Sequence, residues 1–157
     1  MKPVVHMSAK EYQEMLRRES GKKKPKHHNK FVYVYEDGMV SDIKTLTGHG
    51  AIVRRYDSKK EFARHRELKI LERIGRIKDL RWQVPMLIQE GFTDQNGKKV
   101  RPIFYDADFT YTENGKEIVE DVKGIDKKTG RPQTTEAFRL KWKLLAARYP
   151  GKEFRIY

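Results

Sequence analysis

Two short stretches of the sequence carry acidic and basic residues at spacings suited to metal-assisted hydrolysis. The first is Asp106-Ala107-Asp108 and the second is Asp121-Val122-Lys123. Asn114-Gly115 lies between them, and this dipeptide is typical of two-residue hairpin turns. We therefore expect the two stretches to lie on the two strands of one β-hairpin.

The turn also fixes which residues of this hairpin face each other. A two-residue loop puts Glu113 opposite Lys116, and each further pair steps back by one residue on the first strand and forward by one on the second. Asp108 is then opposite Asp121. Directly opposed side chains have Cβ atoms roughly 4.5–5.5 Å apart, and two carboxylates at that distance share a proton or a cation. The register therefore predicts a cation site.

The expected cation is Mg²⁺ or Mn²⁺, because both prefer carboxylate and carbonyl oxygens. Asp108 and Asp121 supply the carboxylates, and the backbone carbonyl of Val122 is a further candidate ligand. The same register puts Asp106 opposite Lys123, on the face of the two acids. A lysine there can orient or deprotonate an attacking water and stabilise the charge that develops in phosphodiester hydrolysis. Asp-x-Lys also occurs in simple surface ion pairs, so the prediction depends on the opposition of the two acids.

The charge distribution indicates a polyanionic partner. Net charge is +13, from 35 Lys and Arg against 22 Asp and Glu. Bases outnumber acids by nine to three in residues 1–30, eleven to five in 54–81 and ten to three in 123–157, whereas residues 82–122 contain four bases and eight acids. Nucleic acid is the expected partner, and an anionic membrane is less favoured because no strongly amphipathic basic helix is present. A basic protein that is merely soluble is the simpler alternative.

A basic arm is expected near the N-terminus. A capping box at Ser8 predicts a helix to about Glu19, and residues 22–30 lack apolar periodicity. This arm is either a solvated linker or a phosphate-contacting tail, in which the candidate nucleic-acid-binding residues are Lys22, Lys23, Lys24 and Lys26.

The remaining pattern predicts an α/β fold. Strands at 31–35, 39–43 and 51–56 form an accessory ribbon. A helix over 58–77 follows, with Phe62, Leu71, Ile74 and Ile77 toward the core, then strands at 82–88, 101–112 and 116–123. A helix from Thr134 or Thr135 to Arg148 and a strand at 153–157 complete the order αβββαβ. We expect residues 1–56 to be accessory and residues 57–157 to be the core.

Composition bounds the class of protein. The chain lacks cysteine and any apolar run near the roughly 20 residues of a membrane span. One compact α/β domain in a soluble cytoplasmic protein, with no disulfide or thiolate zinc site, is therefore expected.

A family resemblance agrees with this interpretation. Tyr105-Asp106-Ala107-Asp108-Phe109 and Val119-Glu120-Asp121-Val122-Lys123-Gly124 resemble the PD-(D/E)-x-K nuclease pattern, with Ala107 in place of its proline. The αβββαβ order resembles the restriction-endonuclease-like core of that superfamily, a mixed sheet flanked by helices. With Tyr56 to Glu61 added, about the last hundred residues are similar to small phage-encoded endonuclease-like proteins related to Holliday-junction resolvases. The resemblance implies a Mg²⁺-dependent endonuclease for branched DNA. If junctions are the substrate, a homodimer is expected, since paired sites must cut two strands.

The resemblance also implies further site residues. A glutamate on the first helix completes the metal site in these nucleases, and Glu61 matches it, although Ser58-x-x-Glu61 is equally a capping box. Glu67 is the alternative on the same helix. Lys141 is either a polar helper near the site or an exposed helical lysine. Glu120 is expected on the opposite face, and the scattered histidines are expected to be solvated.

Two other functions remain open from the sequence. One is a non-catalytic nucleic-acid-binding accessory protein, and the other is a flap-cleaving or nicking enzyme with the same fold. The opposition of Asp108 and Asp121 favours an enzyme, because a protein that only binds gains nothing from it.

Overall fold

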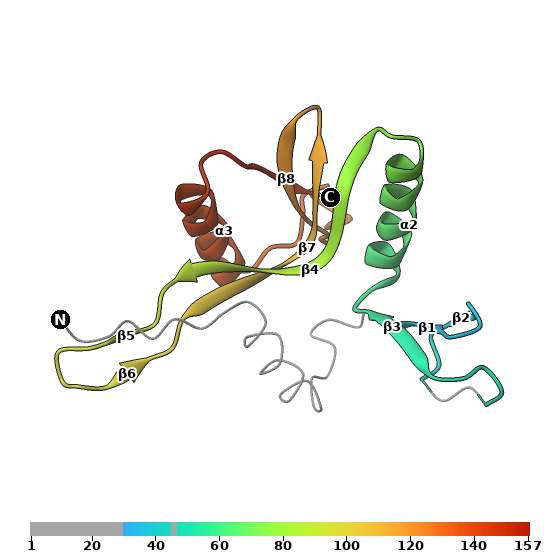
Figure 1. Ribbon diagram of the computed structural model, residues 1–157, viewed down its shortest axis with the longest axis horizontal. Helices are drawn as coiled ribbons and strands as arrows, with labels where there is room; N and C mark the ends of the chain where they lie inside the picture. The colour runs from blue at the N-terminus through green and yellow to red at the C-terminus, as the bar shows by residue number, and fades with distance from the viewer. Residues whose placement is uncertain (1–29, 45–46) are drawn as a thin grey trace.

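The computed structural model describes residues 30–44 and 47–157 and has a mixed α/β fold (Figure 1). Its main sheet has four strands in the order β4-β7-β8-β9. Their bounds are β4 Ile77–Gln89, β7 Ile103–Glu113, β8 Lys116–Asp121 and β9 Glu153–Ile156. The first three are antiparallel, while β9 runs parallel to β8, so the sheet is mixed. The predicted helix at residues 8–19 and the basic arm lie outside the described residues, apart from Lys30.

Two helices cover opposite sides of the β7–β8 hairpin (Figure 1). Helix α2 spans Lys59–Arg73, and helix α3 spans Glu136–Arg148. Leu68 of α2 packs with Phe109 and Ile118, whereas Leu145 of α3 packs with Ala107 and Val119. The two helices and the strands of the main sheet follow in the order α2, β4, β7, β8, α3, β9, which agrees with the predicted αβββαβ order apart from a short hairpin inserted between β4 and β7.

Both helices begin where their capping residues predict. The Ser58 hydroxyl accepts a hydrogen bond from the Glu61 backbone N–H at 3.0 Å, and the Thr135 hydroxyl accepts one from Phe138 at 3.1 Å. Side-chain oxygens at these positions satisfy N–H groups that lack helical partners. The choice between Thr134 and Thr135 is thus resolved in favour of Thr135.

The predicted end of the helix over residues 58–77 was wrong. Helix α2 stops at Arg73, because Gly75 adopts a φ of +74°, a left-handed conformation that ends helices. Ile74 is therefore 62% exposed instead of facing the core. Ile77 is buried as expected, but it begins strand β4, which is longer than the predicted strand at 82–88. Pro85 lies on this edge strand, where a missing N–H is tolerated.

The hairpin register was predicted correctly over its regular part. Asn114 and Gly115 both have positive φ, as a type I′ turn requires, and the pairs run from Glu113–Lys116 to Phe109–Glu120. The regular ladder ends there. The predicted pairing of Asp106 with Lys123 is not part of it, since β8 ends at Asp121 and the residues beyond it turn toward the C-terminus of the chain.

The alternation predicted for β7 holds only in part. Tyr105 and Ala107 pack in the cluster below α3, whereas Phe109 and Tyr111 pack in the cluster below α2. A strand of 11 residues twists along its length, so residues of one predicted face meet different helices at its two ends.

Two smaller sheets complete the described structure. The ribbon consists of β1 Val32–Tyr35, β2 Val40–Ser41 and β3 Ile52–Tyr56, which fall within the three predicted strands, and their order in the sheet is β2-β1-β3. A short hairpin of β5 Phe92–Thr93 and β6 Lys99–Val100 was not predicted and projects beyond β4 and β7 (Figure 1). Within the described ranges, neither helix has the length and apolar character needed to cross a membrane.

Candidate active site

The two predicted acids lie at the end of the β7–β8 hairpin that is remote from its turn. Asp121 is the last residue of β8 and is only 2% exposed. Asp108 is partly buried, and its Oδ2 accepts a hydrogen bond of 2.6 Å from the backbone N–H of Val122. Burial raises the pKa of Asp108 well above its usual value, and the charges of Asp121 and Glu61 raise it further. The three carboxylates are thus electrostatically coupled.

Both oxygens of Asp121 are engaged by neighbouring donors. The ammonium group of Lys123 contacts Oδ2, and the hydroxyl of Tyr105 donates a hydrogen bond to Oδ1. Burial, followed by the charge of Asp121, raises the pKa of Tyr105, so this phenol remains a donor. Tyr105 was missed from the sequence because alternation assigned it to the opposite face. The aromatic residues Phe138 and Trp142 of α3 surround its ring.

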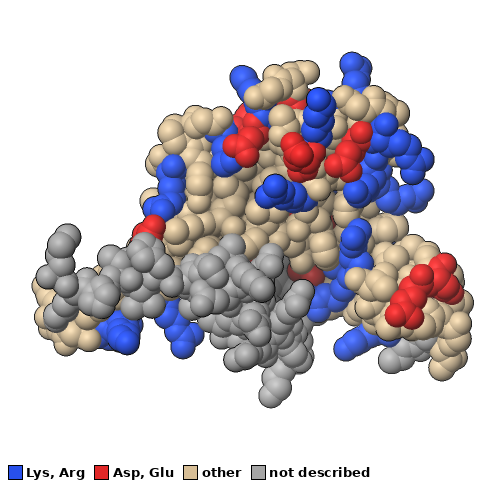
Figure 2. Space-filling model, in the orientation of Figure 1, with Lys and Arg blue, Asp and Glu red and all other residues tan. Residues whose placement is uncertain are grey.

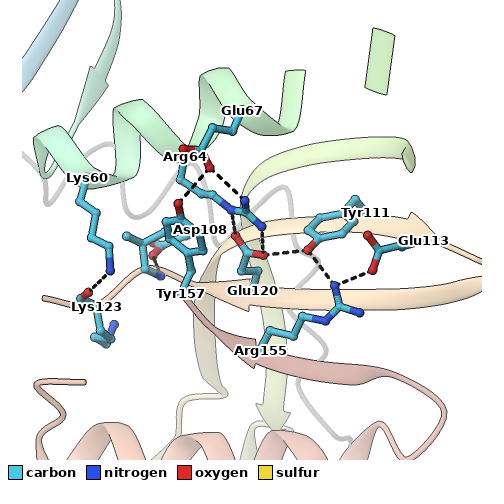
Figure 3. A network of polar contacts seen from close by, with 11 residues as sticks. Lys60, Arg64, Glu67, Asp108, Tyr111, Glu113, Glu120, Lys123, Arg155 and Tyr157 are labelled. Atoms are coloured by element: carbon cyan, nitrogen blue, oxygen red, sulfur yellow. Dashed lines mark hydrogen bonds and ion pairs between the residues drawn. The ribbon is translucent and has the colours of Figure 1, made fainter. Parts of the chain in front are cut away.

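Lys123 is held by backbone contacts on both of its sides. Its N–H donates to the carbonyl of Tyr157 at 2.9 Å, and the N–H of Tyr157 donates to the carbonyl of Asp121 at 2.9 Å. Lys60 of α2 donates to the Lys123 carbonyl at 2.8 Å (Figure 3). The Lys123 ammonium lies 4.5 Å from the ring centre of Phe138. The Asp-x-Lys segment is therefore fixed by β9 and by both helices.

Glu61 is buried beside this segment and also caps its helix. Its Oε2 accepts the N–H of Asp57 at 2.9 Å, and its Oε1 accepts the indole N–H of Trp82 at 3.0 Å. Burial raises the pKa of Glu61, with a further contribution from the charge of Asp121, while its two hydrogen bonds oppose the rise. The capping interpretation is thus confirmed, with Asp57 as partner, one residue before the Ser58 N-cap. A role for Glu61 as a metal ligand stays a prediction.

The other candidates are not brought to the acidic pair. Glu67 is exposed and accepts hydrogen bonds from Arg64 at 3.0 Å and from the Tyr157 hydroxyl at 2.9 Å. Lys141 is partly buried in α3, and none of the contacts described joins it to Asp108 or Asp121. The four candidate lysines of the arm lie outside the described residues.

A buried ion pair next to the site was not predicted. Glu120 is 1% exposed and accepts hydrogen bonds from Arg64 at 2.7 and 2.8 Å and from the Tyr111 hydroxyl at 2.7 Å (Figure 3). Glu120 does lie on the face opposite to Asp121, as expected. It joins α2 to β8 immediately before Asp121, so it helps to fix the helix that carries Glu61.

His65 contradicts the expectation that the histidines are solvated. It is 4% exposed, its Nδ1 lies 2.7 Å from the Tyr56 hydroxyl, and its ring stacks near Trp82. Burial lowers the pKa of His65 to about 4, so the ring is neutral at physiological pH. The sequence signal was its position four residues after Glu61, which puts both on the inner side of the helix.

The donor chemistry of the site suits a divalent cation. Asp108 lies within electrostatic reach of Asp121 and Glu61, and the Lys123 ammonium contacts Asp121. Carboxylates and the Val122 carbonyl are ligands that Mg²⁺ and Mn²⁺ accept. Within residues 30–44 and 47–157, however, no three acidic or histidine side chains converge into a ready cation cage. Each oxygen of Asp121 accepts from one donor and keeps a second lone pair with which it can hold a cation.

Comparison with known proteins identifies a family. A search of the curated proteins finds no match. A protein-family model matches residues 44–156, which include β3, both helices and all four strands of the main sheet. The match covers more than half of the chain, so the chain belongs to the family described as "Protein of unknown function (DUF1064)".

Proposed function

We propose that this protein is a metal-dependent endonuclease that hydrolyses phosphodiester bonds in DNA. The observation that carries the proposal is the pair of the partly buried Asp108 and the buried Asp121, with Lys123 two residues further along and in contact with the second acid. Close carboxylates with a lysine beside them are the groups that metal-assisted phosphodiester hydrolysis uses.

Each residue has a distinct role in this proposal. Asp108, Asp121 and the Val122 carbonyl hold Mg²⁺ or Mn²⁺, and Glu61 is the additional carboxylate. The bound metal supplies Lewis-acid stabilisation of phosphate charge and a water of lowered pKa. Lys123 orients that water or stabilises the developing negative charge.

The wider structure supports a restriction-endonuclease-like core. Its elements follow the αβββαβ order that the resemblance implies, and its helices cover both faces of a mixed sheet. DNA is the proposed substrate because of the net charge of +13 and the many basic side chains of the visible face in Figure 2. Branched DNA, including four-way junctions, is the proposed structural class. Two paired cuts in a junction need a homodimer.

The main alternative is a non-catalytic DNA-binding accessory protein. The placement of Asp108 beside Asp121 counts against it, because two neighbouring carboxylates repel each other when both are ionised. A protein that only binds DNA has no use for such a cost. A flap-cleaving or nicking enzyme uses the same residues, so substrate comparison is needed to separate it from a junction nuclease.

The test compares labelled linear, flap and four-way-junction DNA, each with Mg²⁺, with Mn²⁺ and with a chelator. We expect metal-dependent cleavage that Asp121→Asn abolishes. Glu67→Gln is the matched control, because it also neutralises a carboxylate on the described surface, but one that lies outside the acidic pair. Absence of cleavage on every substrate with either metal contradicts the proposal, and the accessory protein then replaces it.

A further inference from the structure

A cavity of about 620 Å³ lies between helix α2 and the ribbon, away from the acidic pair. Figure 1 shows α2 rising directly from strand β3 of the ribbon. The aliphatic part of the lining comes from Val34, Val40 and Val53 on the ribbon and from Ile70 on the helix. Val53 is 59% and Ile70 is 56% exposed, so this apolar lining is open to solvent.

The rim of the cavity is basic. Arg66, Lys69 and Arg73 line it from α2, and Arg54 lines it from β3. Among the described residues that line the cavity, none is acidic. The spacing of three, four and seven residues puts the helical cations on one side of α2, over roughly 10 Å. In Figure 2, Lys and Arg side chains gather over α2 and continue toward the ribbon.

These cations are only partly satisfied by neighbours. Lys69 donates to Glu72 at 2.9 Å, and Glu72 does not line the cavity. The Arg54 guanidinium lies 5.2 Å from the ring centre of Trp82 and donates to the Tyr56 hydroxyl at 3.3 Å. The ion pair with Glu72 offsets part of the Lys69 charge, whereas the two contacts of Arg54 are to uncharged groups and leave its charge uncompensated there.

We propose that this cavity binds a segment of single-stranded nucleic acid. An unstacked base contacts the aliphatic lining and the partly buried ring of Phe62, and the adjacent phosphates contact Arg66, Lys69 and Arg73. A row of cations along two helical turns is better suited to bind an anion that repeats, such as a chain of phosphates, than to bind a single charged group. An apolar lining matches bases better than the groove of a paired duplex, whose bases are stacked inside.

Charge complementarity disfavours the basic N-terminal segment of the chain as the occupant. Residues 1–30 hold nine Lys and Arg against three acids, and a positively charged segment does not complement a basic rim. Strand binding does not depend on the proposed activity. A second statement does rest on the proposed nuclease activity. It is that the cavity holds an unpaired strand of the substrate while Asp108 and Asp121 act on the DNA.

The first test measures binding of a fluorescein-labelled oligothymidylate of about 12 nucleotides by anisotropy, in a chelator. Arg66→Ala/Arg73→Ala should weaken binding by about tenfold or more and reduce the salt slope by roughly 1.4, since each phosphate contact to a single strand contributes about 0.7. The matched control is Arg139→Ala/Lys143→Ala, which removes two exposed cations from α3. It should stay within about twofold of the parent. Equal losses in both double variants overturn the proposal.

The second test separates bases from phosphates. Ile70→Ser, at an exposed position where folding is not at risk, should weaken oligothymidylate binding several-fold and leave inorganic polyphosphate binding unchanged. Tighter binding of an acidic Glu-Phe repeat peptide, or equal binding of a duplex of the same length, contradicts the single-strand assignment.

The same measurements separate this inference from the proposed nuclease activity. If the parent cuts no DNA but the arginine variant still loses strand binding, the nuclease proposal fails and the cavity assignment stands. If the parent cuts DNA and the arginine variant binds the strand as the parent does, the cavity assignment fails alone.

Discussion

The carboxylate of Asp108 accepts a hydrogen bond of 2.6 Å from the backbone N–H of Val122. The regular ladder between β7 and β8 ends one residue earlier, at the pair Phe109–Glu120. The side chain of Asp108 therefore provides the next link between the strands and attaches the first acid directly to the Asp-x-Lys segment. An amide oxygen can accept the same hydrogen bond, which makes asparagine an informative replacement.

Asp108→Asn should leave the metal-free protein as stable as the parent or more stable, by up to about 1 kcal/mol, because it removes repulsion from Asp121. Cleavage and the rise in melting temperature that Mg²⁺ causes should both be lost. Thermal unfolding with and without Mg²⁺, together with a cleavage assay, measures these effects. Undiminished cleavage by this variant would show that Asp108 is not in the active site.

The stability difference between Asp108→Asn and the parent should depend on pH. The pKa of Asp108 is raised in the folded protein, so the folded chain keeps this proton to higher pH than the unfolded chain, whose pKa is about 3.9. The contribution of Asp108 to stability is most favourable below that value and falls as pH rises through the folded pKa. Urea unfolding from pH 4 to 8 should therefore show a growing advantage for the variant, and a constant difference would contradict the buried, coupled state.

His65 predicts a pH dependence of the opposite sign. Its pKa is about 4 in the folded protein and about 6.5 in an unfolded chain, so its contribution to stability is complete above pH 6.5 and is lost as pH falls toward 4. At pH 5 the loss is about 2 kcal/mol. His65→Asn keeps a polar group near the Tyr56 hydroxyl but does not titrate, so its unfolding free energy should fall less between pH 7 and 5. Parallel curves for the two proteins would exclude a neutral, buried His65.

Local sequence signals predicted the elements well, and tertiary contacts explain what they missed. Asn114-Gly115 set the register and Ser58 set a helix start, because both act through nearest neighbours in the chain. Gly75 ended α2 before the end of the apolar pattern. The last apolar residue of that pattern, Ile77, belongs to the next strand, β4.

The environment of the site was harder to predict for the same reason. Arg64 and Glu120 are 56 residues apart in the sequence, and no periodicity links them. Tyr105 reaches Asp121 because β7 twists and the tyrosine ring is long, whereas strict alternation assumes a flat strand. The available signal was the alternation of β8, which puts Glu120 on the same face as the apolar Ile118, because a carboxylate on an apolar face needs a partner.

The Arg64–Glu120 pair predicts a strongly non-additive double mutant. Arg64→Met leaves the carboxylate of Glu120 buried without its cation and should cost about 3–5 kcal/mol of unfolding free energy. Adding Glu120→Gln removes that charge and keeps an acceptor for the Tyr111 hydroxyl, so the double variant should regain about half of the loss or more.

Urea unfolding of the two single variants and the double variant gives the coupling. Lys69→Met is the control, because it breaks an exposed ion pair with Glu72 and should cost less than about 1 kcal/mol. If the two single losses simply add, the pair is not coupled in the folded protein.

Deletion of the basic arm should change DNA affinity without changing the rate of cleavage. If Lys22, Lys23, Lys24 and Lys26 contact phosphates, deletion of residues 22–30 should weaken binding to all DNA sequences and flatten its dependence on salt. The rate of cleavage at saturating enzyme should be retained. Titrations at several salt concentrations test this, and an unchanged slope would assign the segment to a solvated linker.

Lys123 gives the prediction that separates a nuclease from a DNA-binding protein most sharply. Its ammonium group contacts Asp121, while its backbone is held by Tyr157 and Lys60, so truncation of the side chain leaves the strand in place. Lys123→Ala should slow cleavage by about 10² or more, because the attacking water and the developing charge lose their cation. Metal binding, measured with Ca²⁺ by calorimetry, should be retained, since the alanine variant frees an oxygen of Asp121 from its lysine partner.

DNA binding separates the outcomes for this variant. One cation lost among 35 changes phosphate attraction only slightly, so affinity without Mg²⁺ should stay within a few fold of the parent. Lys116→Ala is the control, because it removes an exposed lysine at the turn end of the same hairpin and should leave both rate and affinity unchanged. If Lys123→Ala cuts DNA as fast as the parent, Lys123 has no part in the chemistry. Loss of DNA affinity with no separate loss in rate at saturation would instead make it a phosphate contact, as the accessory-protein alternative requires.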